Sequence, residues 1–232
     1  MKCLYYFVFV VASYSKRLLL RMFVYISDYK AVFTHICNRN LWHGKESVSG
    51  TGSDTVHTIV IRNKLPNILK QYKVSSVLDA ACGDFNWMKK VNLPLDMYIG
   101  VDIVQQIIEN NNQLYAHEKQ RFMNLDISKD RLPRTDFILC RDCLVHYPYS
   151  IIFNILKNLK QSGATYLFTT TFPQKKCNVD IYHAGYEWRP LNLEMAPFNF
   201  PKPILIINEE YKTIPAFVDK SMGLWKFSDL HL

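Results

Sequence analysis

The chain has 232 residues, of which 49% are hydrophobic and 21% charged, and this balance favours one globular domain with an N-terminal extension. Its six cysteines are too sparse for a small secreted domain stapled by disulfides, so we expect a reducing, cytoplasmic location. The formal charge of +8 permits nucleic acid or an acidic membrane surface as a partner. Because the lysines and arginines are scattered, nucleic acid is not favoured.

The first 40 residues form a basic, apolar extension ahead of a domain that we expect over residues 41–232. The apolar run at residues 4–12 is too short for a membrane-spanning helix, and basic residues follow it. A secretory signal is not favoured, because no clean cleavage site of small residues precedes the folded part. Two interpretations stay open: residues 1–26 make weak peripheral contact with an anionic membrane as an interfacial helix, or they form a poorly ordered or self-packed extension.

The segment from residue 42 to 54, WHGKESVSGTGSD, is rich in serine and glycine and is predicted to be a loop. It is either a linker or a lid over the site that follows it. Ser53 or Asp54 is expected to cap a helix. Pro66 breaks or restarts this helix, which ends near Tyr72. The apolar positions predicted on its inner face are Val56, Ile59, Val60, Ile68, Leu69 and Tyr72.

The stretch from residue 74 to 88, VSSVLDAACGDFNWM, organises the rest of the domain. Its apolar run ends at the carboxylate of Asp79, and small residues then lead to Asp84, which is predicted to open a helix. A turn of this kind exposes backbone N–H groups and lets a nucleotide-like ligand approach the main chain. The dinucleotide pattern G-x-G-x-x-G is absent, because Ala81 and Phe85 stand where glycines are expected, and this disfavours a pyrophosphate ligand.

The next two predicted strands, residues 97–102 and 121–125, also lead into carboxylates. Asp102 could accept hydrogen bonds from both hydroxyls of a ribose. Asp126 could read an adenine edge together with the backbone N–H of Ile127. Because ligands of open α/β sheets bind outside the carboxyl ends of the strands, three carboxylates at successive strand ends indicate a nucleoside site.

Strands and helices alternate through the rest of the domain. The remaining predicted strands are residues 135–140, 164–170, 204–208 and 224–227, and the remaining predicted helices are residues 87–91, 103–115 and 149–161. Such alternation demands right-handed crossovers and a doubly wound, mostly parallel sheet. The aromatic, proline-rich loop at residues 172–203 is expected above the carboxyl edge of this sheet, where it would set substrate specificity.

Three runs, VLDAACGDFNWM, YIGVDI and CRDCLVH, resemble class I S-adenosylmethionine-dependent methyltransferases, within a small subgroup whose first motif is of the CGDFNWM type. The resemblance covers about residues 42–232 and implies S-adenosylmethionine as the cofactor. It also implies a Rossmann-like sheet of seven mostly parallel strands in the order 3-2-1-4-5-7-6, with helices on both faces. The residues that it places at the cofactor are Asp79, Ala81, Cys82, Gly83, Asp102, Ile103, Asp126, Ile127 and Cys140. Asp79 and Gly83 would face the methionine part, Asp102 the ribose, and Asp126 with Ile127 the adenine.

The run after the fourth predicted strand is RDCLVHY, where amino-group methyltransferases carry D/N-P-P-Y. Methyl transfer is an in-line displacement, so the protein mainly aligns the reactants and excludes water. His146 has the pKa range to deprotonate a hydroxyl, and Arg141 and Asp142 could position a substrate. We therefore expect O-methylation of a small-molecule or carbohydrate-like acceptor.

Several alternatives to this interpretation stay open. His146 could be a structural residue that only holds its loop. The chain could methylate RNA, or bind S-adenosylmethionine without turnover. Cys140 and Cys143 form a C-x-x-C, but no second cysteine or histidine pair completes a zinc site, so no metal is expected. The oligomeric state is open.

Overall fold

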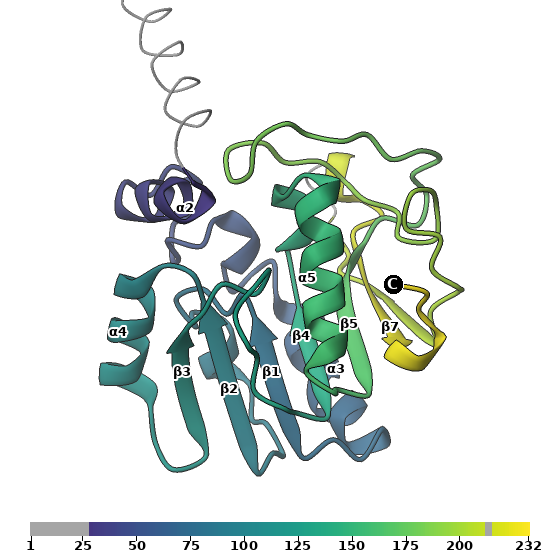
Figure 1. Cartoon of the computed structure of the whole chain (residues 1–232). Coiled ribbons are helices and arrows are strands. Elements are labelled where there is room, and N and C mark those ends of the chain that lie inside the picture. The colour runs from purple at the N-terminus through teal and green to yellow at the C-terminus, as the bar shows by residue number, and fades with distance from the viewer. Residues whose placement is uncertain (1–27, 212–214) are drawn as a thin grey trace, which may run out of the picture.

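The computed structural model describes residues 28–211 and 215–232, which form one seven-stranded sheet in the order β3-β2-β1-β4-β5-β7-β6 (Figure 1). The strands are β1 (Ser76–Ala80), β2 (Met97–Asp102), β3 (Gln120–Asn124), β4 (Phe137–Cys140), β5 (Tyr166–Thr171), β6 (Leu205–Asn208) and β7 (Ser221–Lys226). The α-helices described are α2 (Tyr29–Asn38), α3 (Ile59–Gln71), α4 (Gln105–Tyr115) and α5 (Tyr149–Gln161). Only β7 runs antiparallel to its neighbours, β5 and β6. The predicted Rossmann-like fold and strand order are confirmed.

The parallel register brings the carboxyl ends of the central strands to one edge of the sheet. Asp79 in β1 lies opposite Gly100 in β2 and Leu139 in β4. The arrowheads of β1, β2 and β3 accordingly point the same way in Figure 1. Side chains that follow these strands therefore gather at this edge, where open α/β sheets bind their ligands.

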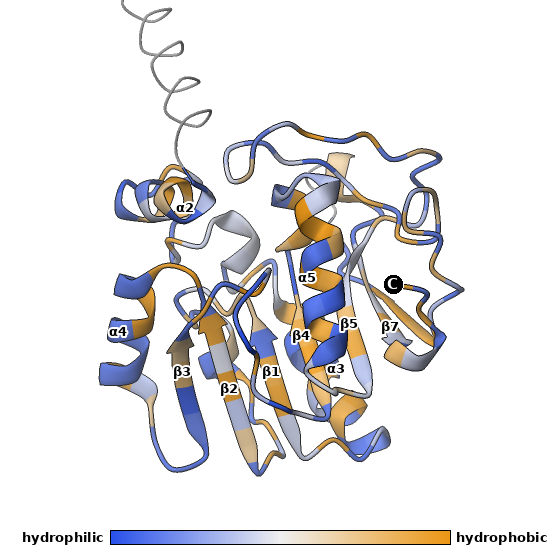
Figure 2. Ribbon diagram, viewed as in Figure 1, coloured by the Kyte–Doolittle hydropathy of each residue, from blue (hydrophilic) through white to orange (hydrophobic). Residues whose placement is uncertain are grey.

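Successive residues of each central strand face opposite sides of the sheet, so the domain has a core on both faces. Leu78 belongs to the hydrophobic cluster that contains Ile155 of α5, whereas Val77 belongs to the cluster that contains Leu65 of α3. Figure 1 shows α5 in front of β4 and β5, and α3 on the far side. Hydrophobic residues accordingly run along β1, β4 and α5 in Figure 2.

Helix α3 begins later than predicted and presents a different face to the core. Val56 lies before the helix and is 68% exposed, and Ile59 in its first turn is 52% exposed. The prediction that Val56 and Ile59 face the core is therefore wrong. The side chains of α3 that are buried against the sheet form a different stripe. That stripe is Ile61, Leu65, Ile68 and Leu69. The helix also continues through Pro66, because packing on both sides of the proline offsets the missing backbone hydrogen bond.

Helix α2 packs into the domain, although it lies on the extension side of the boundary expected at residue 40. Asp28 caps it by accepting a hydrogen bond from the backbone N–H of Ala31 at 2.8 Å. Its inner face, Val32, Phe33 and Ile36, is buried in the same cluster as β1 and α5. A domain boundary at residue 40 would thus separate α2 from β1 and α5, although their side chains pack in the same core. The membrane contact expected for residues 1–26 lies outside the described residues, and no helix within the described part is long and apolar enough to cross a membrane.

Candidate functional site

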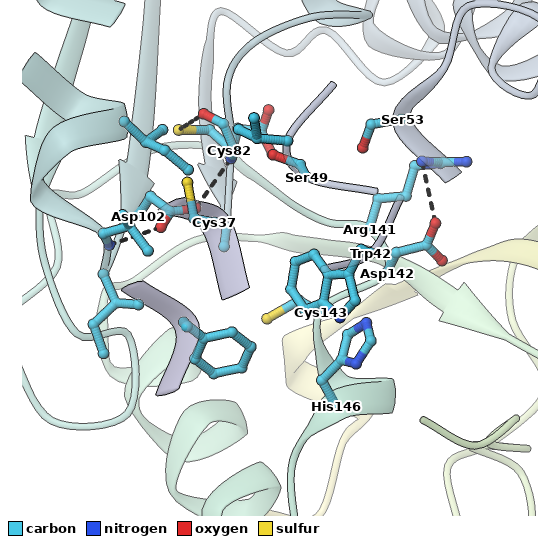
Figure 3. Close-up of a pocket in the computed structure, with 18 of the residues that line it drawn as sticks. Cys37, Trp42, Ser49, Ser53, Cys82, Asp102, Arg141, Asp142, Cys143 and His146 are labelled. Atoms are coloured by element: carbon cyan, nitrogen blue, oxygen red, sulfur yellow. Dashed lines mark hydrogen bonds and ion pairs between the residues drawn. The ribbon is translucent and has the colours of Figure 1, made fainter. Parts of the chain in front are cut away.

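A cavity lies at the carboxyl edge of the sheet and is lined by five separate segments of the chain (Figure 3). Helix α2 and the loop at residues 42–54 form one side, and the turn after β1, the tip of β2 and the segment after β4 form the other. The predicted site residues that line it are Asp79, Ala81, Cys82, Gly83, Asp102, Ile103, Arg141, Asp142 and His146. Residues far apart in sequence therefore meet where the motifs predicted a ligand.

The turn after β1 holds Gly83 in a left-handed conformation, with φ of 55°. Its N–H donates to Asp102 at 3.1 Å, and its carbonyl accepts from Asn111 of α4 at 2.8 Å. A Cβ on Gly83 would lie 2.3 Å from the Ser49 hydroxyl oxygen. The turn therefore requires glycine here for both its backbone conformation and its close approach to the loop at residues 42–54.

No α-helix opens at Asp84, so that prediction is wrong. Phe85 has φ of 58°, the conformation that a glycine at this place would take, and its ring is buried among aromatic side chains. These neighbours are Tyr98, Tyr115 and Phe122, with ring centroids 5.1 to 5.3 Å away. Burial of this ring offsets a left-handed backbone that costs about 1–2 kcal/mol. The chain then forms only a 3-10 turn at Met88–Lys90.

The loop at residues 42–54 is tied to the turn after β1 through Asp84. The Asp84 carboxylate accepts hydrogen bonds from the Ser47 hydroxyl at 2.8 Å and from the Val48 N–H at 3.0 Å. The Asp84 N–H in turn donates to the Ser49 hydroxyl at 3.1 Å. Trp42, Val48, Ser49 and Ser53 line the cavity. The loop thus forms a wall of the cavity, as a lid would, whereas a plain linker would not need these contacts.

Two buried carboxyl groups face the cavity from β1 and β2. Burial raises the pKa of Asp79 to about 7, although a hydrogen bond from the Tyr98 hydroxyl at 2.6 Å acts in the opposite direction. Burial also raises the pKa of Asp102 to about 6, against hydrogen bonds from the N–H groups of Val104 and Gly83. A ligand that brings a positive charge or hydroxyl donors would stabilise the ionised form of both carboxyl groups.

Three of the predicted cofactor residues do not line this cavity. Asp126 accepts hydrogen bonds from the Tyr29 hydroxyl of α2 at 2.6 Å and from Ser128. The carboxylate predicted to bind the adenine edge is therefore already hydrogen-bonded to α2. Ile127 is buried in the core. Cys140 is fully buried, and its carbonyl accepts from the Thr169 hydroxyl at 2.7 Å.

A buried cluster of four charged groups supports the segment after β4, and the motifs did not predict two of them. Glu209 follows β6 and Lys220 precedes β7, so the antiparallel pairing of these strands places both at the carboxyl edge. Arg141 donates two hydrogen bonds to Glu209, at 2.6 and 3.1 Å, and Lys220 contacts the same carboxylate at 3.0 Å. Glu209 directly follows the predicted strand at residues 204–208, and this position is a signal that could have identified it. Lys220 lies next to a strand only because β7 begins at Ser221, earlier than predicted.

Asp142 belongs to this cluster and is its most exposed side chain, at 25%. Burial alone would raise its pKa, but the charges of Lys220 and Arg141 lower it to about 2. Arg141 also donates to the carbonyl of Gly52 at 2.9 Å, which joins the cluster to the loop at residues 42–54. Asp142 is therefore an ionised hydrogen-bond acceptor at neutral pH and too weak a base to remove a proton.

His146 lies beside Asp142, in the 3-10 turn Leu144–His146, with its ring stacked on Trp42 at a centroid distance of 4.9 Å (Figure 3). Its Nδ1 lies 3.2 Å from the carbonyl oxygen of Glu187. Because a carbonyl only accepts, Nδ1 carries the proton and Nε2 keeps a free lone pair. Burial lowers the pKa of His146 to about 4, so the ring is neutral at pH 7. The ordinary pKa predicted for this histidine is therefore wrong, and the buried ring is a weaker base than expected.

Cys82 and Cys143 also line the cavity, and both pKa values are raised. For Cys82 the main cause is burial, and for Cys143 it is a hydrogen bond with Cys140 followed by burial. These thiols are therefore protonated at neutral pH. Within residues 28–211 and 215–232, no three histidine, cysteine or acidic side chains gather in a way that could hold a metal ion.

The fold described above is that of class I S-adenosylmethionine-dependent methyltransferases. The N-methyltransferase NodS from Bradyrhizobium japonicum WM9, solved with S-adenosyl-L-homocysteine, superposes with a TM-score of 0.62 at 12% identity, over 84% of this chain and 98% of NodS. Human N-acetylserotonin methyltransferase, solved with S-adenosylmethionine, gives a TM-score of 0.54 at 11% identity, over 73% of this chain and 52% of that enzyme. The methyltransferase domain of bacterial CtHen1 gives 0.53 at 13% identity, over 72% and 97%. The sequence matches no protein-family model, and no curated protein is significantly similar to it.

Proposed function

We propose that this protein is an S-adenosylmethionine-dependent O-methyltransferase that acts on a small-molecule acceptor. The observation that carries the proposal is the meeting of Asp102, Asp79 and the Gly83 turn with His146 in one cavity at the carboxyl edge of a methyltransferase fold. NodS and human N-acetylserotonin methyltransferase, which share this fold, were solved with S-adenosylhomocysteine or S-adenosylmethionine bound.

The residues of the cavity suit the parts of this cofactor. Asp102 can accept hydrogen bonds from the two ribose hydroxyls, since a carboxylate has about four acceptor sites and the hydrogen bonds from Gly83 and Val104 fall on different oxygens. Asp79 can receive the ammonium group of the methionine part, beside Ala81, Cys82 and the Gly83 turn. Ile103 and its apolar neighbours can flank the adenine. Asp126 and Ile127 would take part only if the Tyr29 hydroxyl moved away.

S-adenosylmethionine, when bound, supplies an electrophilic methyl group on a sulfonium. His146 takes the proton of the acceptor hydroxyl on Nε2 as the oxygen forms its bond to the methyl carbon. The carbonyl of Glu187 and the ring of Trp42 fix the orientation of the imidazole. Asp142 accepts a hydrogen bond from the acceptor, and Arg141 and Lys220 keep this carboxylate ionised. The half-buried walls exclude water from the reaction.

Calorimetry with S-adenosylhomocysteine tests the cofactor site. The wild-type protein should bind it, and Asp102→Ala should weaken binding by about 1.5–3 kcal/mol, the value of a hydrogen bond to a charged group. Asp96→Ala is the matched control, because Asp96 is exposed and precedes the opposite end of β2. Failure of the wild type to bind, or equal loss in both variants, would refute the proposed site.

A further inference from the structure

A second cavity of about 210 Å³ adjoins the cofactor cavity. The two cavities share four residues in their walls, namely Trp42, Ser49, Asp142 and His146. A molecule in the second cavity therefore contacts the side chains at which the cavities meet. If the proposed methyl transfer takes place, on which this inference rests, the second cavity is where the acceptor binds.

Four aromatic rings line the second cavity. Trp42 stacks on His146, and Trp188 meets Phe217 edge to face with centroids 4.9 Å apart. Tyr186 is the fourth ring, and its buried hydroxyl has no hydrogen-bond partner among the residues that the structure describes. Half-buried aromatic faces favour a ligand with an apolar face, and a buried unpaired hydroxyl favours a ligand that also offers polar groups.

The charged groups beside the second cavity compensate one another. Lys220 has three N–H donors, and Asp142, Glu209 and the Tyr211 hydroxyl lie within reach of them. The Oδ2 atom of Asp142 faces Lys220 and Arg141, whereas its Oδ1 has only a 3.4 Å contact with the Thr170 hydroxyl. The charged side chains in the described wall are already paired with one another, so none is left to pair with an anionic or cationic acceptor. A neutral hydroxyl, in contrast, can donate to Oδ1.

We infer that the acceptor is a neutral, hydroxyl-rich saturated ring of the sugar or cyclitol class. The apolar C–H face of such a ring can pack on Trp188 or Trp42. Its hydroxyls can reach Ser49, Thr51 and Asp142, which also line the cavity. A flat phenol would cover the aromatic walls but would offer these polar groups fewer hydroxyls than a sugar or cyclitol does. In the reaction, one ring hydroxyl forms the O–C bond, the S–C bond breaks, and the proton passes to His146, which yields a methyl ether and S-adenosylhomocysteine.

Saturation-transfer NMR on the full chain tests this inference, both with and without S-adenosylhomocysteine. The probes are methyl α-glucopyranoside, methyl β-galactopyranoside and myo-inositol, set against catechol, tyramine and phenyl phosphate. We expect signal transfer to at least one of the first three probes. Trp188→Leu and Thr51→Val should each weaken that binding by about tenfold, because they remove an aromatic face and a hydroxyl respectively.

Tyr182→Leu is the matched control, because Tyr182 lies in the same long loop and is 88% exposed. It should leave the binding of the probes unchanged. Transfer only to catechol, tyramine or phenyl phosphate would overturn the inference, as would transfer to none of the six or equal binding by all variants. Calorimetry keeps the two proposals apart: if S-adenosylhomocysteine binds and the hydroxylated rings do not, only the acceptor class is wrong.

Discussion

Glu209 is the side chain on which the buried charge cluster depends, and Glu209→Gln tests that dependence. The carboxylate is 0% exposed and lies between Arg141 and Lys220, with three contacts of 2.6 to 3.1 Å. The amide keeps the shape of the side chain but changes the net charge of the cluster from zero to +1. Removing one partner of a buried ion pair costs about 3–5 kcal/mol, since the remaining charges stay desolvated. Typical domains have about 5–15 kcal/mol of stability, so the variant should still fold.

Urea unfolding followed by tryptophan fluorescence measures this loss. Glu210→Gln is the control, because the neighbouring carboxylate is exposed and should change the free energy of unfolding by less than about 0.5 kcal/mol. Adding Lys220→Met to Glu209→Gln returns the cluster to zero net charge, so the double variant should recover part of the lost stability. If Glu209→Gln is as stable as the wild type, or the second change only adds to the loss, the electrostatic argument is refuted.

Two further predictions concern the base and helix α2. His146→Ala should slow turnover by about 10²–10⁴-fold while leaving the affinity for S-adenosylhomocysteine nearly unchanged. Saturating S-adenosylmethionine should keep Asp79 and Asp102 ionised, although their pKa values are about 7 and about 6 without a ligand. Because burial lowers the pKa of His146 to about 4, the kcat/KM for the acceptor under that condition should stay level from pH 8 to about pH 5 and fall only as the ring becomes protonated below that; an acidic limb near 6.5 would contradict this. Ile36→Ala should lower the free energy of unfolding by about 2–5 kcal/mol, because the Ile36 side chain in α2 is 0% exposed. Lys30→Ala, on the exposed side of the same helix, is the control and should not lower it. Equal melting temperatures of the two variants would show that α2 is not part of the core.

The sheet could be predicted from sequence because each central strand is a short apolar run between polar turns. Alternation with helices then allows few topologies, and the register of parallel strands brings Asp79 and Asp102 to one edge. Local chemistry also indicated the Gly83 turn. These features depend on residues that are close in sequence, or on rules that hold for every open α/β sheet.

The missed features depend on contacts between distant residues. Glu209 and Lys220 meet Arg141 only because β6 and β7 pair at the far side of the sheet. Phe85 adopts a glycine-like conformation because three aromatic rings from other elements surround it, and no local pattern reports such packing. The sequence around α2 did contain a local signal, since Asp28 precedes apolar residues at helical spacing. The basic, apolar run that precedes this helix favours an extension that reaches residue 40, and this outweighs the local helix signal.

Helix α2 also bears on the proposed base, although it does not contain it. A Cβ on Gly185 would lie 2.6 Å from a Val32 methyl carbon of α2, so the long loop packs directly on this helix. The Gly185 N–H donates to the carbonyl of His146 at 3.0 Å, and Arg189 donates to carbonyls on both sides of that histidine. The backbone at His146 is therefore held by a loop that packs on α2. A site assembled in this way needs residues on both sides of position 40, which is why a boundary drawn there would divide the site as well as the core.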